Sequence, residues 1–291
     1  MFRFLLLLFV LILFNHNASL ALSNNSIIVT LSIKPSYKLN SLRQYPSAYQ
    51  SPNQPSYKPP NMSKAKKSKS FDWRATNHIS PVKNQEDCQA SWAFSIVANV
   101  ESHISIHTNW KIFLSEQFLI DCDTEQYGCI NGSLTKAFIN VVTKLNGILR
   151  NTDYIQFNRE QNYCTYIPPK PAVIPVYGFK KLPADEYLME QTLMKHGPLS
   201  AVINSIMMKN HQPRTIDTPL DGECDPSTRD HAVLIIGYDS YRGPDLKEVP
   251  YWIIKNSWGK GWGDNGYYRL ERGINACGIA EEVFIPEISL T

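Results

Sequence analysis

The sequence predicts an α+β fold, because helical and strand patterns lie in different halves of the chain. Residues 91–107 place apolar side chains around most of a helix, as expected for a buried central helix. Residues 197–203, 231–237 and 251–254 are dense in β-branched residues and bounded by Gly or Pro, as strands often are. The 291 residues give room for one large domain or for two lobes, and a helix-rich first lobe beside a strand-rich second lobe would suit a cleft between them.

The chain begins with a pattern typical of a secretory signal peptide. Arg3 precedes an unbroken apolar run over residues 4–14, and small residues at 19–21 offer a cleavage site. The run is too short to span a bilayer comfortably, and no second long apolar stretch follows it. We expect residues 1–21 to be removed and the protein to be secreted or delivered to a lysosome- or endosome-like compartment, without a membrane anchor.

Residues 22–70 form an arm rich in Pro, Ser, Tyr and Lys, which predicts an extended segment. Within it, only residues 26–33 have the pattern of a strand. Residues 1–70 hold nine basic and no acidic residues, whereas the rest of the chain holds 20 basic and 26 acidic residues. The net charge of +3 therefore combines a basic arm with an acidic body. Because this arm follows a secretory signal, we expect no nucleic-acid partner.

Six cysteines follow the signal segment, at positions 88, 122, 129, 164, 224 and 277. An even number of cysteines in a secreted chain predicts three disulfides, for which the sequence alone permits fifteen pairings. If all six are paired, no thiol is left to act as a nucleophile. No metal-ligand cluster or phosphate-binding Gly loop is found, so we expect neither a metal nor a cofactor.

Residues 81–95 read PVKNQEDCQASWAFS, which resembles the signature PVKNQxxCGSCWAFS of papain-like cysteine peptidases. The run Phe71-Asp72-Trp73-Arg74, the run Asp230-His231-Ala232-Val233 and the run Asn256-Ser257-Trp258-Gly259 continue the resemblance in the same order. It implies a papain-like two-lobe domain over residues 71–291. Its helical first lobe would span about 78–172, with short helices at 114–122 and 134–145, and its antiparallel β-rich second lobe about 173–291.

The resemblance also implies a disulfide pairing and a role for each motif. The implied bonds are Cys88–Cys129, Cys122–Cys164 and Cys224–Cys277. In the implied catalytic set, Ser91 stands where the family has its nucleophilic cysteine, His231 is the base, Asn256 orients it, and the Gln85 side chain and the Ser91 N–H are the oxyanion donors. His231 and Asn256 follow Ser91 by 140 and 165 residues, and we attribute the long spacing to a polar loop inserted at 238–250.

The serine at position 91 changes the expected chemistry. A papain-type cysteine reacts as a thiolate beside an imidazolium, because its pKa falls well below the free value of about 8.5. A serine hydroxyl has far too high a pKa to form that pair, and Asn256 lacks the negative charge that supports the histidine of serine peptidases. We therefore expect peptidase activity to be lowered by orders of magnitude.

Further residues are predicted to line the substrate cleft. Gly132, Asp230, Trp258 and Glu282 occupy cleft positions by the resemblance, and Glu282 would be the floor of the main specificity pocket, suited to basic or aromatic side chains. The alternative for Glu282 is an ordinary solvated glutamate. Gln89 replaces a glycine of the signature. Sequons at Asn24, Asn61 and Asn131 are glycosylation candidates, the last of them on the cleft rim.

Three functions compete. The first is a secreted papain-like pseudoenzyme that binds peptide or protein ligands, protease inhibitors among them. The second is an active serine variant using Ser91, His231 and Asn256, either as a weak endopeptidase or for silica condensation, because the run CQAS at 88–91 is similar to that of the sponge silicateins. The third is a structural or adhesive protein that works through its arm.

The arm at 22–70 is about half as long as a papain-like pro-segment and lacks its amphipathic helix. Two explanations stay open. Either the protein has no activity that needs inhibition, or the sequence comes from an incomplete gene model or a different first exon.

Overall fold

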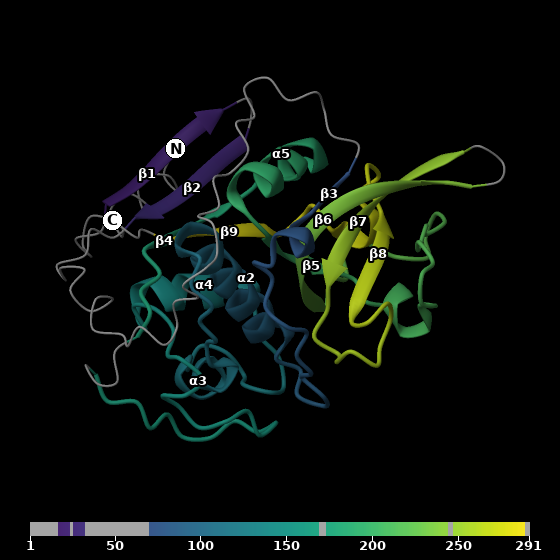
Figure 1. Cartoon of the computed structure of the whole chain (residues 1–291). Coiled ribbons are helices and arrows are strands. Elements are labelled where there is room, and N and C mark those ends of the chain that lie inside the picture. The colour runs from purple at the N-terminus through teal and green to yellow at the C-terminus, as the bar shows by residue number, and fades with distance from the viewer. Residues whose placement is uncertain (1–16, 24–25, 33–69, 169–172, 244–246, 289–291) are drawn as a thin grey trace.

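The computed structural model describes residues 17–23, 26–32, 70–168, 173–243 and 247–288 (Figure 1). The sequons at Asn24 and Asn61 and most of the basic arm lie outside these residues. Within the described part of residues 91–288, three of the four α-helices come first and strands dominate the part that follows, as the α+β prediction requires.

Three helices form the first lobe: α2 (Ser91–Thr108), α3 (Glu116–Cys122) and α4 (Leu134–Thr143). Serine side chains begin two of them, since Ser115 Oγ accepts from the N–H of Phe118 and Ser133 Oγ from that of Lys136. Helix α2 is buried along nearly its whole length and lies at the centre of the lobe. Its predicted range of 91–107 is confirmed to within one residue.

The second lobe is built on an antiparallel sheet in the order β4-β9-β5-β6-β7-β8. Its strands are β4 (Gly178–Lys181), β5 (Leu199–Ile203), β6 (His231–Arg242), β7 (Glu248–Lys255), β8 (Tyr267–Glu271) and β9 (Val283–Glu287). The short strand β3 (Phe71–Asp72) pairs with β6, and helix α5 (Glu186–His196) packs on the lobe. Three 3₁₀ helices complete it: η4 (Trp73–Thr76), η5 (Met207–Asn210) and η6 (Ala276–Gly278).

The prediction of a polar loop at 238–250 is wrong for most of its length. Strands β6 and β7 continue as a ribbon with paired residues from Tyr238 and Trp252 out to Arg242 and Glu248. Figure 1 shows this ribbon projecting away from the sheet. Both of its faces are largely solvated near the tip, so its side chains are polar, and such a sequence resembles a loop although residues 238–242 pair with residues 248–252.

Two strands lie before the domain. Strand β1 (Asn17–Ser23) pairs with β2 (Ser26–Ser32), and β2 pairs with β4, which extends the sheet beyond β4 (Figure 1). The strand predicted at 26–33 is therefore present. Strand β1 begins inside the predicted signal peptide, and cleavage after residue 21 would leave two residues of it.

All six cysteines are in disulfides: Cys88–Cys129, Cys122–Cys164 and Cys224–Cys277. These are the pairs that the resemblance implies. The first bond ties two loops of the first lobe, the second ties the end of α3 to a later loop, and the third ties the segment before β6 to η6 in the second lobe. Across the described ranges, no helix combines the length and the apolar character needed to cross a membrane.

Candidate active site

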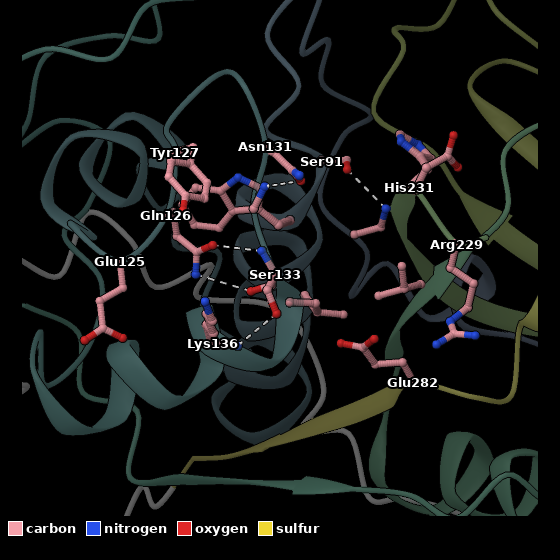
Figure 2. Close-up of a pocket in the computed structure, with 16 residues that line it drawn as sticks. Ser91, Glu125, Gln126, Tyr127, Asn131, Ser133, Lys136, Arg229, His231 and Glu282 are labelled. Atoms are coloured by element: carbon pink, nitrogen blue, oxygen red, sulfur yellow. Dashed lines mark hydrogen bonds between the residues drawn. The ribbon is translucent and has the colours of Figure 1, made fainter. Parts of the chain in front are cut away.

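A cleft of about 340 Å³ opens between the N-terminus of α2, the segment 125–134 and the start of β6 (Figure 2). Its lining contains several of the predicted site residues and several that the sequence did not suggest. The lining residues are Ser91, Trp92, Glu125, Gln126, Tyr127, Asn131, Gly132, Ser133, Leu134, Lys136, Val202, Arg229, Asp230, His231, Ala232 and Glu282.

Ser91 is the first residue of α2 and is 6% exposed. Its Oγ accepts a hydrogen bond of 3.1 Å from the backbone N–H of Ala232, the residue after His231 (Figure 2). The first N–H groups of a helix have no partner within it and give this end a partial positive charge. The hydroxyl therefore lies where negative charge on a reacting carbonyl would be stabilised.

His231 begins β6 and is buried against Trp258, with 4.8 Å between the ring centroids. Its Nε2 lies 2.8 Å from Asn256 Oδ1, which can only accept, so Nε2 carries the proton and Nδ1 holds the lone pair. Burial lowers the pKa of His231, against the opposing effects of the Asn256 hydrogen bond and the Asp230 charge. The imidazole is thus neutral at pH 7 and can act as a base through Nδ1.

Gln85 lies behind the cleft and is buried. Its Oε1 accepts from Ser257 Oγ at 2.5 Å and its Nε2 donates to the carbonyl of Cys88 at 2.8 Å. The backbone N–H of Gln85 also donates to the Ser257 carbonyl, at 2.7 Å. These bonds connect the segment before α2 to the segment that carries Asn256.

The cleft wall at Gly132 requires a glycine. A Cβ at this position would lie 2.3 Å from the Trp92 ring, so the backbone of 131–133 can approach that ring only without a side chain. Asn131 is exposed on the same rim, and its Oδ1 accepts from the N–H of Gly132 at 2.6 Å. The sequon at Asn131 is therefore accessible from solvent.

Residues 67–287 match the family described as papain family cysteine protease. The chain belongs to this family. Relatives include cathepsin F of Drosophila melanogaster, 36% identical and aligned over 73% of this chain and 34% of that protein. A viral cathepsin of Lymantria dispar multicapsid nuclear polyhedrosis virus is 35% identical, over 73% of this chain and 57% of its own. The chain thus spans between a third and three fifths of these relatives.

Solved papain-family structures share the fold. Digestive procathepsin L2 from the larval midgut of Tenebrio molitor superposes with a TM-score of 0.69 at 32% identity, covering 76% of this chain and 69% of that one. The proform of the ragweed pollen allergen Amb a 11, a cysteine protease, gives a TM-score of 0.68 at 28% identity. The prediction of a papain-like α+β fold with two lobes is confirmed.

The structure brings some predicted site residues together at the cleft and places others behind it. Ser91, Gly132, Asp230, His231 and Glu282 line the cleft. The other predicted site residues are not in the cleft lining. Asn256 and Trp258 contact His231 through a hydrogen bond and a ring contact, whereas Gln85 bonds to Ser257 and Cys88.

Two of the cleft carboxylates are already bound by neighbouring side chains. Glu282 Oε1 accepts from Thr135 Oγ1 of α4 at 2.7 Å. Both carboxylate oxygens of Asp230 are held by Ser205, through its backbone N–H at 2.8 Å and its hydroxyl at 3.0 Å. Asp230 therefore positions the start of β6 beside His231.

Among the cleft residues that sequence reasoning missed are Tyr127, Lys136 and Arg229. Arg229 stands two residues before His231, and this closeness in sequence was the available signal. Tyr127 and Lys136 gave no signal, because they reach the cleft through the turn at 127–131 and the first turn of α4. In the part of the chain that the structure describes, no group of three or more His, Cys, Asp or Glu side chains could hold a metal ion.

Proposed function

We propose that this chain is a secreted papain-family pseudoenzyme that binds peptide segments in its cleft and cleaves them poorly or not at all. The observation that supports this most is the hydroxyl of Ser91 at the N-terminus of α2, beside a buried His231–Asn256 pair and with no thiol in reach. The cleft itself is open and lined with polar groups, as peptide recognition requires.

Two features of this site lower the reactivity of the hydroxyl. Ser91 Oγ already accepts the Ala232 N–H, and no hydrogen bond joins it to His231 among the described residues. Asn256 carries no negative charge, so it supports an imidazolium less than a carboxylate does. Proton removal from Ser91 therefore lacks both the aligned base and the charge stabilisation that serine peptidases use.

The test is Ser91→Cys in the full chain, expressed in a eukaryotic secretory host. We expect kcat/KM on peptide substrates to rise by roughly 10³-fold or more, because loss of a nucleophile costs a comparable triad on the order of 10⁶-fold. Ser91→Ala is the matched control and is expected to bind peptides as the wild type does. Wild-type turnover at the rate of Ser91→Cys would contradict the proposal.

A second candidate, an enzyme that uses Ser91 as its nucleophile, is favoured by the lone pair on His231 Nδ1. Its test compares wild type and Ser91→Ala in peptide hydrolysis and in silicic acid condensation. Activity present in the wild type and lost in Ser91→Ala would support this candidate, and equal behaviour of the two proteins would exclude it.

A further inference from the structure

We infer that Arg229 and Glu282 together select an uncharged ligand side chain whose tip both donates and accepts hydrogen bonds. The carboxamide of glutamine fits this requirement best. This inference rests on the proposed peptide binding. It changes the expectation from the sequence, in which Glu282 alone would favour a basic or aromatic side chain.

Arg229 and Glu282 line the same part of the cleft (Figure 2). Arg229 comes from the segment before β6, and Glu282 directly precedes β9. No ion pair joins the two in the described part of the chain, although both line the cleft. A ligand side chain between them therefore meets a cation and an anion that do not neutralise one another.

The guanidinium of Arg229 is positioned by its own loop. Its Nη1 donates to the Pro226 carbonyl, and its Cδ would lie 3.0 Å from a Cβ at Gly278, so the side chain packs against the glycine of η6. The disulfide Cys224–Cys277 holds these two segments together. The Nε of Arg229 is fully buried and closed to a ligand, so the N–H groups of Nη2 and the second N–H of Nη1 are the donors left for a ligand acceptor.

The carboxylate of Glu282 is positioned from the other lobe. Thr135 Oγ1 donates to its Oε1 at 2.7 Å, and the Glu282 carbonyl accepts from the N–H of Val202 at 3.1 Å. A carboxylate has about four lone-pair sites, so Oε2 can still accept from a ligand. Glu282 thus offers an acceptor and Arg229 offers donors across one pocket.

The two charges exclude most charged ligand side chains. Lysine or arginine would pair with Glu282 but would meet Arg229 as a like charge, and glutamate would meet Glu282 in the same way. An aliphatic side chain would leave both groups desolvated without partners. A carboxamide places its C=O on the guanidinium and its NH₂ on the carboxylate, and it satisfies both.

The experiment measures binding of the full-length wild type to blocked alanine-rich pentapeptides in which the central residue is Gln, Lys, Glu, Leu or Ala. We expect the Gln peptide to bind at least about tenfold more tightly than the Lys and Glu peptides. Arg229→Gln should raise affinity for the Lys peptide, and Glu282→Gln should raise it for the Glu peptide. Lys209→Gln, an exposed lysine outside the cleft, is the control and should leave the order unchanged.

The outcomes distinguish failure of the inference about Arg229 and Glu282 from failure of the proposed peptide binding. If the Lys peptide binds the wild type most tightly, or if the Arg229 and Glu282 variants keep the wild-type order, the inference about Arg229 and Glu282 is wrong while peptide binding stands. If none of the five peptides binds, both the inference and the binding role of the cleft are wrong. Should Arg229→Gln fail to fold, Arg229→Lys, which keeps the charge and loses the planar fork, is expected to weaken the Gln preference.

Discussion

The two walls of the cleft are held in place by different kinds of bond. On the first-lobe side, the segments 84–90 and 125–133 are irregular backbone tied to each other by the bond Cys88–Cys129, and Cys122–Cys164 ties the end of α3 to a later loop. On the second-lobe side, His231 and Glu282 stand at the starts or edges of strands that pair with β5. One wall therefore depends on covalent cross-links and the other on a hydrogen-bonded ladder.

This difference indicates how each lobe tolerates change. In a strand ladder, many backbone hydrogen bonds together fix the position of each residue. A change of one side chain therefore shifts the backbone little. A cross-linked loop depends on a few contacts, such as the bond of 2.8 Å from the Gln89 N–H to the Cys129 carbonyl. We expect the first-lobe wall to be the more fragile side of the site.

The largest effect should come from removing one disulfide from each lobe in turn. The bonds span 41 residues for Cys88–Cys129 and 53 for Cys224–Cys277, so each double Cys→Ala variant should lose about 4 kcal/mol in free energy of unfolding. The first variant should also weaken binding of every peptide, whereas the second should mainly reduce discrimination among them. Denaturant unfolding measures the loss of stability, and peptide titration measures the loss of affinity. Equal loss of affinity in the two variants would contradict the claim that the two cleft walls are held in place differently.

A smaller effect is expected from the buried charges of the first lobe. Lys83 Nζ lies 3.0 Å from Glu101 and 2.6 Å from Glu116, which raise its pKa although burial alone would lower it. Burial raises the pKa of Glu116 in turn. Lys83→Met leaves two buried carboxylates without their cation and should cost about 3 kcal/mol of unfolding free energy at pH 7.

The cost of Lys83→Met should fall as the pH is lowered toward 4, because the Glu116 carboxyl, whose pKa is raised by burial, then takes up a proton and no longer needs a counter-ion. Lys144→Met, at an exposed pair with Glu125, is the matched control and should cost less than about 1 kcal/mol. A pH-independent cost at Lys83 would mean that lost packing, and not lost charge, destabilises the variant.

The contact between the lobes should depend on pH through His103. This α2 residue is buried, its Nε2 lies 3.0 Å from the Pro198 carbonyl, and burial lowers its pKa to about 4. Its stabilising contribution is therefore complete above the unfolded pKa of about 6.5 and is lost as the pH falls toward 4. Between pH 7 and 4.5 we expect a loss of about 2 kcal/mol from this group.

His103→Gln isolates that contribution, because glutamine can still donate to the Pro198 carbonyl but does not titrate. The burial-lowered pKa values of His107 and His196, which lie nearby, act in the same direction and persist in the variant. The measurement is denaturant unfolding of both proteins at the two pH values. A wild type that loses no more stability than the variant would contradict the assignment.

The smallest effect is expected at the cleft rim. Asn131 is exposed and contacts the N–H of Gly132, so Asn131→Gln should change the free energy of unfolding by less than about 0.5 kcal/mol. If the secreted Asn131→Gln protein is lighter than the wild type by the mass of a glycan, Asn131 carries a sugar. A large loss of stability would instead indicate that the turn at 127–131 depends on this side chain.

Several elements could be predicted because their signals are local. Helix α2 has apolar residues on every face, and Ser115 begins α3 as a serine N-cap. Helix α5 was missed although Asp185 accepts from the N–H groups of Tyr187 and Leu188, which is a usable N-cap signal. The ribbon of β6 and β7 was taken for a loop, because polar residues on a solvated ribbon carry no apolar alternation.

The sequence by itself determined the serine at position 91, the even number of cysteines, the core helix and the motifs around His231 and Asn256. Only the tertiary structure decided that Ala232 donates to Ser91 and that Arg229 shares a pocket with Glu282. These contacts join segments far apart in the chain. Strand register and the packing of the two lobes set such contacts, and neither is encoded in local propensity or in the spacing of a motif.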